Sequence, residues 1–330
     1  MSPGGRSQDR GSGAAVDRHV HLEGSLDPAW VRRRARELGQ PLPAALEALW
    51  RLEPVPFGGF IEAFLFGCRL LDGTEAVRAA VAAAAGRLGE TAGPRGIDLW
   101  VSPHFLAVQG RFLPLDALWR GLELGIQDAA AQGVRVAVVI DAVNHFGPAH
   151  GHEVLDLVLP GRPSWVVGFS TGGLEQVPFR EWAPVFQRAR GAGLRLAAHA
   201  GENGPGSNVR DAILEAGVQR IVHGVRAAAD PALVELLAER RIPVDICLSS
   251  NRALVPELAA GRTHPLPALL AAGVRCALGT DDPGVIPCTL PGEWSLARGL
   301  GLGPEACALL TRHALEDGWC FAGGPGVNPA

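Results

Sequence analysis

Four short polar clusters end apolar runs of this sequence, and their residue types could bind a metal ion and move protons. The clusters contain His19 and His21, His199 and Glu202, His223, and Asp281 and Asp282. Imidazole and carboxylate groups are common zinc ligands and the usual proton-transfer groups at neutral pH. Each cluster lies where a strand is expected to stop and a loop to begin. Active-site residues occupy that position in parallel α/β barrels.

Each cluster alone also has an ordinary structural explanation. His19 and His21 lie two residues apart, so both rings point to one side of a strand, but such a pair is often only hydrogen-bonded. A single histidine at a strand end, such as His223, is often a satisfied buried group. The sequence Asp-Asp-Pro at 281–283 is typical of a turn. The coincidence of all four at expected strand ends favours one site with one metal ion.

Eight short apolar runs rich in β-branched residues predict strands. They lie at residues 16–20, 97–101, 134–140, 165–169, 194–199, 219–223, 242–247 and 274–279. Helical spacing between them is clearest at residues 28–38, 74–90, 116–132, 179–191, 207–216, 231–240 and 264–272. Eight repeats of this alternation imply an α/β fold closed into a (β/α)8 TIM barrel. A doubly wound open sheet is the alternative, but no glycine-rich fingerprint follows the first strand.

The chain is expected to form a single domain over residues 16–322. The long segment 26–96 would place extra helices over the barrel mouth, and residues 304–317 would form a helical tail after the eighth strand. Residues 1–15 are rich in Gly, Ser and Arg and predict a disordered N-terminal tail. Residues 323–330 predict a frayed C-terminus.

One absence from the composition limits the chemistry that the chain can perform. The sequence contains no lysine, so all 30 of its Lys and Arg residues are arginine, and it contains no tyrosine. A Schiff-base aldolase, a pyridoxal-phosphate enzyme and a P-loop nucleotidase each need a lysine. A two-metal hydrolase bridged by a carboxylated lysine is excluded for the same reason.

The net charge, the apolar runs and the cysteines indicate which partners and which cellular compartment to expect. A formal net charge of −4 gives no electrostatic support for a nucleic-acid partner. No apolar run reaches the roughly 18 residues of a membrane span, and the first residues lack the apolar segment of a signal peptide. The six cysteines have no CxxC spacing and lie mostly in apolar segments. We therefore expect a cytoplasmic enzyme with no membrane or nucleic-acid partner, and we expect nothing specific about its oligomeric state.

Seven segments together form a specific pattern. They are HVHLEGSL (19–26), GFSTGGLE (168–175), HAGENGPGS (199–207), RIVHGVRAAADPAL (220–233), CLSSN (247–251), HPLPALLAAG (264–273) and TDDP (280–283). In these segments the chain resembles the adenosine deaminase family of the amidohydrolase superfamily, over nearly its whole ordered length. The HLEG sequence around Glu23 replaces the HLDG that is typical of adenosine enzymes. In this respect the chain looks like the adenine deaminase and aminodeoxyfutalosine deaminase branches.

The resemblance implies a zinc-dependent enzyme that removes ammonia by hydrolysis from a 6-aminopurine base or nucleoside-like compound. Adenosine, adenine and aminodeoxyfutalosine-like compounds would be the substrates to consider. One Zn²⁺ per chain would be bound by His19, His21, His199 and Asp281. Glu202 and His223 would complete the catalytic groups with Asp281. Glu202 would protonate N1 of the ring, and His223 would orient the attacking water and help to deprotonate it.

The resemblance also implies three contacts with a small purine-like substrate. Asp282 would hydrogen-bond N7, the backbone N–H of Gly173 would meet N3, and Glu23 would contact the sugar or whatever replaces it. Ser170 and Thr171 depart from the family pattern, in which the first position is commonly Asp or Gly. Two alternatives stay open: action on another amino-heterocycle in specialised metabolism, and an inactive binding protein on the same scaffold.

Overall fold

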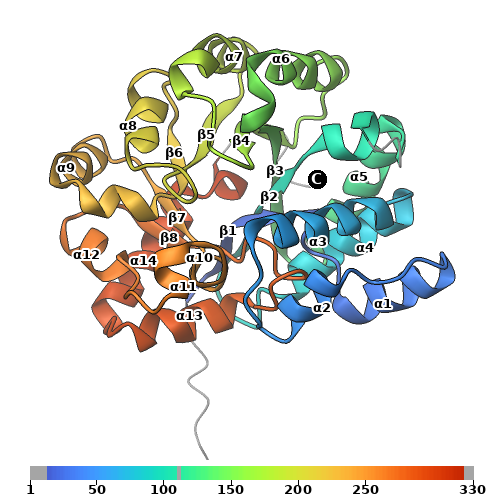
Figure 1. The fold of residues 1–330 in the computed structure, drawn as a ribbon, viewed down its shortest axis with the longest axis horizontal. Helices are drawn as coiled ribbons and strands as arrows, with labels where there is room; N and C mark the ends of the chain where they lie inside the picture. The colour runs from blue at the N-terminus through green and yellow to red at the C-terminus, as the bar shows by residue number, and fades with distance from the viewer. Residues whose placement is uncertain (1–12, 110–112, 323–330) are drawn as a thin grey trace, which may run out of the picture.

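The eight predicted strands form one parallel barrel in the computed structural model, which describes residues 13–109 and 113–322 (Figure 1). Each strand pairs with the next in chain order. Their bounds are β1 Ala15–His21, β2 Arg95–Val101, β3 Val134–Val143, β4 Val166–Gly172, β5 Arg195–Ala200, β6 Arg220–His223, β7 Val244–Ile246 and β8 Cys276–Leu278. All eight lie where the sequence predicted them, and the (β/α)8 barrel is confirmed.

The first and last strands close the barrel near the carboxyl end of β1. Val20 pairs with Asp281, which follows β8 by three residues. The N–H of His21 donates to the carbonyl oxygen of Asp281, and the N–H of Asp281 donates to the carbonyl oxygen of His19, both at 2.8 Å. The seam of the barrel is therefore joined through the backbone of three predicted metal ligands.

Helices surround the barrel in the order that the alternation predicted (Figure 1). The segment between β1 and β2 holds α1 Pro28–Glu37, α2 Ala44–Trp50, α3 Phe57–Leu70 and α4 Thr74–Gly86. Then follow a π-helix η1 His104–Gln109, α5 Leu115–Ala131, η2 Asn144–Phe146, α6 Gly147–Val158, α7 Phe179–Gly191, α8 Ser207–Leu214, η3 Val225–Ala229, α9 Pro231–Glu239, α10 Leu248–Leu254, α11 Pro256–Ala259, α12 Leu266–Ala271, α13 Leu290–Gly299, α14 Pro304–Asp317 and η4 Trp319–Phe321.

The extra helices between β1 and β2 include two, α2 and α3, that the helical spacing did not single out. The α3 sequence FGGFIEAFLFGCRL is apolar on almost every side. Such a helix needs cover on several faces, because an amphipathic surface helix would show a polar stripe. One side of α3 packs into the barrel core, and Phe60 and Phe64 on it also line a cavity at the barrel mouth. The prediction of extra helices over the mouth is confirmed.

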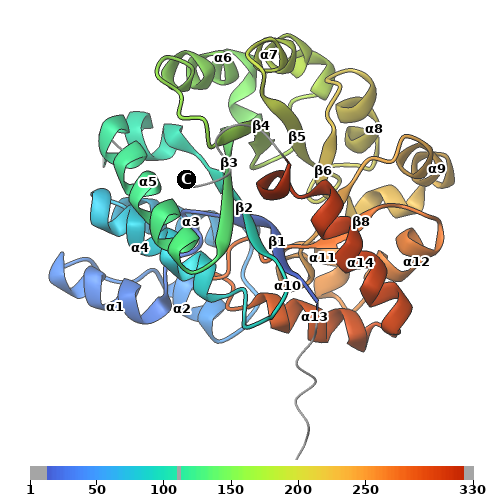
Figure 2. The same cartoon turned by 180° about the vertical axis from the view of Figure 1, so that it is seen from behind.

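A buried charge network lies at the opposite end of the barrel, beside α14 and η4. Figure 2 shows α14 on this side of the barrel. Arg18 and Arg220 are fully buried and face the carboxylates of Asp98 and Asp245. Asp98 Oδ2 lies 2.8 Å from Arg220 Nη1 and 3.7 Å from Arg18 Nε. Asp245 Oδ1 lies 3.0 Å from Arg18 Nη2. The two cations and two anions compensate one another in a region without solvent.

The N-terminal boundary differs from the prediction. Ala15 was placed in the disordered tail, but it begins β1, is 6% exposed and donates its N–H to the Pro94 carbonyl at 2.9 Å. The strand pairing with β2 reaches back to this residue, so the barrel begins there. The rest of that tail, apart from Gly13 and Ala14, and the predicted frayed segment 323–330 lie outside the described residues.

No helix within the described ranges has the length and apolar character to cross a membrane. All six cysteines are free thiols.

Candidate metal centre and active site

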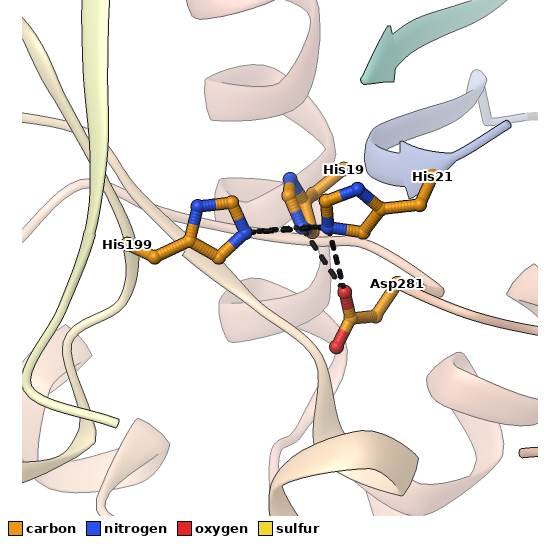
Figure 3. Close-up of side chains that lie close together, drawn as sticks. All are labelled: His19, His21, His199 and Asp281. Atoms are coloured by element: carbon orange, nitrogen blue, oxygen red, sulfur yellow. Dashed lines mark hydrogen bonds and ion pairs between the residues drawn. The ribbon is translucent and has the colours of Figure 1, made fainter. Parts of the chain in front are cut away.

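Four predicted ligands from three strands meet at one point at the carboxyl end of the barrel (Figure 3). The Nε2 atom of His19 lies 3.1 Å from His21 Nε2 and 3.2 Å from His199 Nε2. His21 Nε2 and His199 Nε2 are 3.3 Å apart. Asp281 Oδ1 lies 3.1 Å from His19 Nε2 and 3.4 Å from His21 Nε2. The four atoms therefore form a compact cluster with similar spacings.

The surroundings keep these side chains in the state that a metal needs. Burial lowers the pKa of His19 and of His21 to about 3, and that of His199 well below its usual value. Burial pushes the pKa of Asp281 upward, but the hydrogen bond with His19 and the nearby imidazoles hold it well below its usual value. His199 Nδ1–H donates to the Thr171 carbonyl at 2.8 Å, so the lone pair of Nε2 faces the cluster.

The spacing of this donor set fits zinc. Zn–N bonds of about 2.0–2.1 Å in a tetrahedron place the ligand atoms about 3.3–3.4 Å apart. Three imidazoles and one carboxylate suit this metal, and expansion to five ligands would admit water or substrate. A second possible group consists of His223, Cys247 and Asp281. Burial raises the pKa of the Cys247 thiol well above its usual value, and a protonated thiol is a poor ligand.

Glu202 and His223 stand beside the cluster. His223 Nε2 lies 3.7 Å from Glu202 Oε2 and 4.0 Å from Asp281 Oδ2. Burial raises the pKa of Glu202 to about 7, although His223 opposes the rise. A carboxyl group with such a pKa can both donate and accept a proton near neutral pH. His223 and Asp281 adopt φ values of 66° and 64°, a strained conformation that is frequent at functional sites.

A second glutamate holds the loop that carries Glu202. The carboxylate of Glu175 accepts the backbone N–H groups of Gly201 and Glu202, both at 2.8 Å, and of Asn203 at 3.0 Å. It also accepts the amide of Asn208 at 3.0 Å. Four donors to one carboxylate leave the loop little freedom, so Glu175 fixes where the Glu202 side chain begins.

A chain of hydrogen bonds fixes the proton of His223. The backbone N–H of Leu266 donates to His264 Nδ1 at 3.1 Å, so His264 carries its proton on Nε2. That Nε2–H donates to Asn251 Oδ1 at 3.2 Å, which turns the Asn251 amide toward His223. The amide then donates to His223 Nδ1 at 2.9 Å. Neutral His223 therefore carries its proton on Nε2, the nitrogen that faces the metal cluster.

We expect His264→Ala to lower kcat about 10- to 100-fold, as is typical when a supporting group of a metal site is removed. Without His264, the amide of Asn251 can turn over and the proton of His223 can move to Nδ1. Zinc content should stay unchanged, since neither residue is a metal ligand. His264→Gln offers an N–H donor near the same place and should retain more activity. Joint loss of zinc and activity would show that His264 supports the fold of the site instead.

The cluster opens into a cavity of about 250 Å³, near the lower end of the roughly 300–1,000 Å³ of ligand pockets. His21, His199, Asp281, Glu202 and His223 line it on one side, and Gly173 and Asp282 line it as well. The opposite wall is apolar, with residues from α3, Phe105 and Phe146. The structure thus brings all the predicted site residues except His19 and Glu23 to the wall of one cavity.

Gly173 and Asp282 occupy positions that suit contacts with a ligand. Gly173 has a φ of 79°, and a Cβ there would lie 3.1 Å from the His145 ring, so the position requires glycine. Burial and the adjacent Asp281 raise the pKa of Asp282 well above its usual value. Its Oδ1 atom has no partner among the described residues. A purine nitrogen could supply that partner.

Glu23 is buried and does not line this cavity. It is 1% exposed, and its Oε1 accepts the backbone N–H of Ser102 at 2.7 Å. Ser102 itself lines the cavity. Burial raises the pKa of Glu23 to about 7. Substrate contact by Glu23 stays a prediction, and it would require the free Oε2 atom to reach the ligand.

Three residues that support the site were not assigned a role from the sequence. Glu175, Asn251 and His264 each lie inside a segment that matches the family pattern. Their place in those matching segments is the signal that could have predicted a role for them. Their function depends on contacts across the barrel, between residues 28 and 13 positions apart, which spacing along one strand or helix does not reveal.

Comparison with known proteins agrees with this geometry. A family model described as adenosine deaminase matches residues 15–324. An adenine deaminase from Rhodopseudomonas palustris is 33% identical over 276 residues, which cover 81% of this chain and 78% of that protein. An aminodeoxyfutalosine deaminase from Acidothermus cellulolyticus is 32% identical over 314 residues, which cover 88% of this chain and 83% of that protein.

A solved structure shows the same likeness in three dimensions. The crystal structure of an adenine deaminase from Arthrobacter aurescens matches with a TM-score of 0.80 and 25% identity, over 93% of this chain and 94% of that one. The family model covers almost the entire described chain, including every residue of the metal cluster. The chain belongs to the adenosine deaminase family.

Proposed function

We propose that this protein is a metal-dependent deaminase that hydrolyses the exocyclic amine of a 6-aminopurine base or nucleoside-like compound. The observation that carries the proposal is one cavity whose wall holds a four-ligand metal cluster together with Glu202 and His223. The names of the adenine and aminodeoxyfutalosine deaminase relatives support the same substrate class.

In the proposed binding mode, Gly173 and Asp282 each bond one ring nitrogen of the purine. The N–H of Gly173 donates to N3 of the purine, and the Asp282 carboxyl bonds N7. Both residues line the cavity, and Gly173 lies in the segment that the Asn203 amide holds through the Gly173 carbonyl at 3.2 Å. These contacts place the six-membered ring against Glu202 and the metal cluster. The apolar wall excludes bulk water from the reacting carbon.

The proposed reaction assigns orientation of the water to His223 and proton transfer to Glu202. When bound by His19, His21, His199 and Asp281, a zinc ion supplies Lewis-acid activation of water at neutral pH. His223 donates from Nε2 and so orients that water toward the ring carbon that bears the amine. Glu202 delivers a proton to N1, which neutralises the charge that builds on the ring during attack. The Glu202 carboxylate takes one proton back from the attacking water, and the remaining hydroxyl proton passes to the amine. The C–N bond then breaks, ammonia leaves, and the ring keeps a carbonyl and the proton on N1.

The test is an ammonia-release screen of the zinc-loaded protein. Adenine, adenosine, deoxyadenosine, methylthioadenosine and aminodeoxyfutalosine should be compared by kcat/KM. We expect rapid release from at least one of them. No release from any of the five would contradict the proposed substrate class and favour another amino-heterocycle or an inactive scaffold.

We expect about one zinc ion per chain, bound through the four-ligand cluster. Chelation should abolish activity, and added zinc should restore it. His21→Ala should lose metal and activity together, because three ligands hold zinc less tightly than four. His152→Ala is the matched control, since the His152 ring lies outside the cluster. Elemental analysis that finds two ions per chain, or none in active protein, would rule out this site.

A further inference from the structure

A buried carboxyl group at the end of β3 has no part in the proposed reaction. Asp141 is 3% exposed and lines the cavity. On the same strand Val139 packs in the barrel interior, whereas Ile140 and Ala142 pack toward the outer helices. The alternation of the strand therefore points Asp141 inward. Its Oδ1 atom has no hydrogen-bond partner among the residues that the structure describes.

The neighbouring strand leaves room for this carboxyl at Gly172. A Cβ at that position would lie 2.5 Å from Asp141 Oδ2, so any side chain there would displace the carboxyl. Gly173 follows directly, and its N–H is the group proposed to meet N3. Asp141 thus flanks the N3 side of the proposed purine position, where N9 and its substituent also lie.

Support of the metal ligand His199 does not account for Asp141. The distance from Asp141 Oδ1 to His199 Nδ1 is 3.9 Å, which is too long for a hydrogen bond. That nitrogen already donates to the Thr171 carbonyl at 2.8 Å. Native proteins seldom leave a buried polar atom without a partner, because the loss is costly. The Ser170 hydroxyl of β4 also acts on this carboxyl, but Oδ1 still has no donor among the described residues within hydrogen-bond geometry and can accept one from a ligand.

Two other carboxyl oxygens near the cavity also lack a hydrogen-bond partner in the described part of the chain. Glu23 Oε2 and Asp282 Oδ1 are buried and have no hydrogen-bond partner among the described residues. This part of the site is rich in acceptors and would match a ligand that presents N–H or O–H groups. A carboxyl group can accept a hydrogen bond in either protonation state.

We propose that Asp141 is a substrate-binding residue that accepts a hydrogen bond from an N–H or O–H group on the N3–N9 side of the purine. The inference rests on the proposed function for the placement of the ring. In a free base the donor is N9–H. In a nucleoside it is the 2′-hydroxyl, which is the ribose hydroxyl nearest N3.

Two pairs of compounds test the proposed hydrogen-bond donor, because the members of each pair differ in whether they carry it. 9-Methyladenine lacks the N9–H of adenine, and 2′-deoxyadenosine lacks the 2′-hydroxyl of adenosine. The zinc-loaded protein should favour the donor-bearing member of at least one pair by about 5- to 150-fold in kcat/KM. Asp141→Ala should lose that preference. Asp141→Asn keeps the shape and an acceptor oxygen, so it should retain part of it.

Asp116→Ala is the control for the chemical change. Asp116 is exposed on α5 and does not line the cavity, whereas Ser170, which pairs with Asp141 in the register of β3 and β4, interacts with the Asp141 carboxyl and is left unchanged. The preference of this variant should equal that of the wild type. Zinc content and thermal unfolding should be measured for each variant, so that a disturbed fold or metal site is recognised.

The outcomes separate this proposal from the proposed function. Equal losses on both members of both pairs, no preference in the wild type, or loss of zinc in Asp141→Ala would overturn the role of Asp141 while leaving deamination intact. If the wild type releases no ammonia from these four compounds or from any compound of the five-member screen, the proposed function fails instead. Calorimetric binding of the same pairs to zinc-loaded Glu202→Gln, which avoids turnover, would then still decide the role of Asp141.

Discussion

Replacement of Glu202 by Gln should lower kcat by about 10²–10⁴-fold, the usual contribution of a positioned proton-transfer group. Burial raises the pKa of this carboxyl to about 7, so near neutral pH it can hold a proton and give it away. Gln has the same shape and can donate a hydrogen bond, but it cannot transfer a proton. Steady-state kinetics on the best substrate of the ammonia screen measures the loss.

The rest of the site should be unaffected by this change. Glu175 holds the backbone of residue 202, and the substitution keeps that N–H. Zinc content and the melting temperature should therefore match those of the wild type. Glu181→Gln, which changes an exposed glutamate on α7, should leave kcat unchanged. Activity of Glu202→Gln within a few-fold of the wild type would exclude protonation of the ring by Glu202.

Asp98→Asn should lower the free energy of unfolding more than any of the other substitutions. The Asp98 carboxylate faces Arg220 and Arg18 without solvent, and it also accepts the N–H groups of Trp319 at 2.9 Å and Cys320 at 2.7 Å. Asn removes the negative charge and turns an NH2 group toward one of these donors. Breaking a buried ion pair from one side costs about 3–5 kcal/mol. Urea unfolding measures the change in free energy of unfolding.

An exposed ion pair supplies the control for this measurement. Arg120 Nη1 lies 2.7 Å from Glu123 Oε2, and the two side chains are 59% and 46% exposed. Glu123→Gln should therefore cost about 0–1 kcal/mol. If the two variants unfold at the same urea concentration, the network at the base of the barrel does not contribute through its charges.

The repeating part of the fold was predictable because each strand and most helices carry their own periodic signal. Helix α14 begins and ends at the predicted residues 304 and 317. Helix α3 was harder, since it is covered on several sides and shows no polar face. The helix predicted over 264–272 begins only at Leu266, because the His264 side chain takes up the N–H of that residue.

Some residues of the site were also predictable from the sequence, and others were not. The ligands His19 and His21 could be proposed together because two residues along a strand point to one side. The coincidence of four polar clusters at expected strand ends predicted one metal site, and the family resemblance assigned His199 and Asp281 as its other two ligands. Asp141 had no such signal, since a single Asp after VRVAVVI resembles any strand end. Its importance depends on Gly172 of the next strand, and only the folded barrel places those two residues side by side.

The seam of the barrel also has a consequence for the order of events during synthesis. His19 and His21 leave the ribosome early, but Asp281, which pairs with the first strand, is 262 residues further along the chain than His19. The complete four-ligand site cannot exist until that segment has emerged. A metal ion bound by these four side chains would then connect β1 to the segment that follows β8. Release of the metal should accordingly loosen the β1–β8 junction first, which hydrogen exchange at the amides of His21 and Asp281 would report.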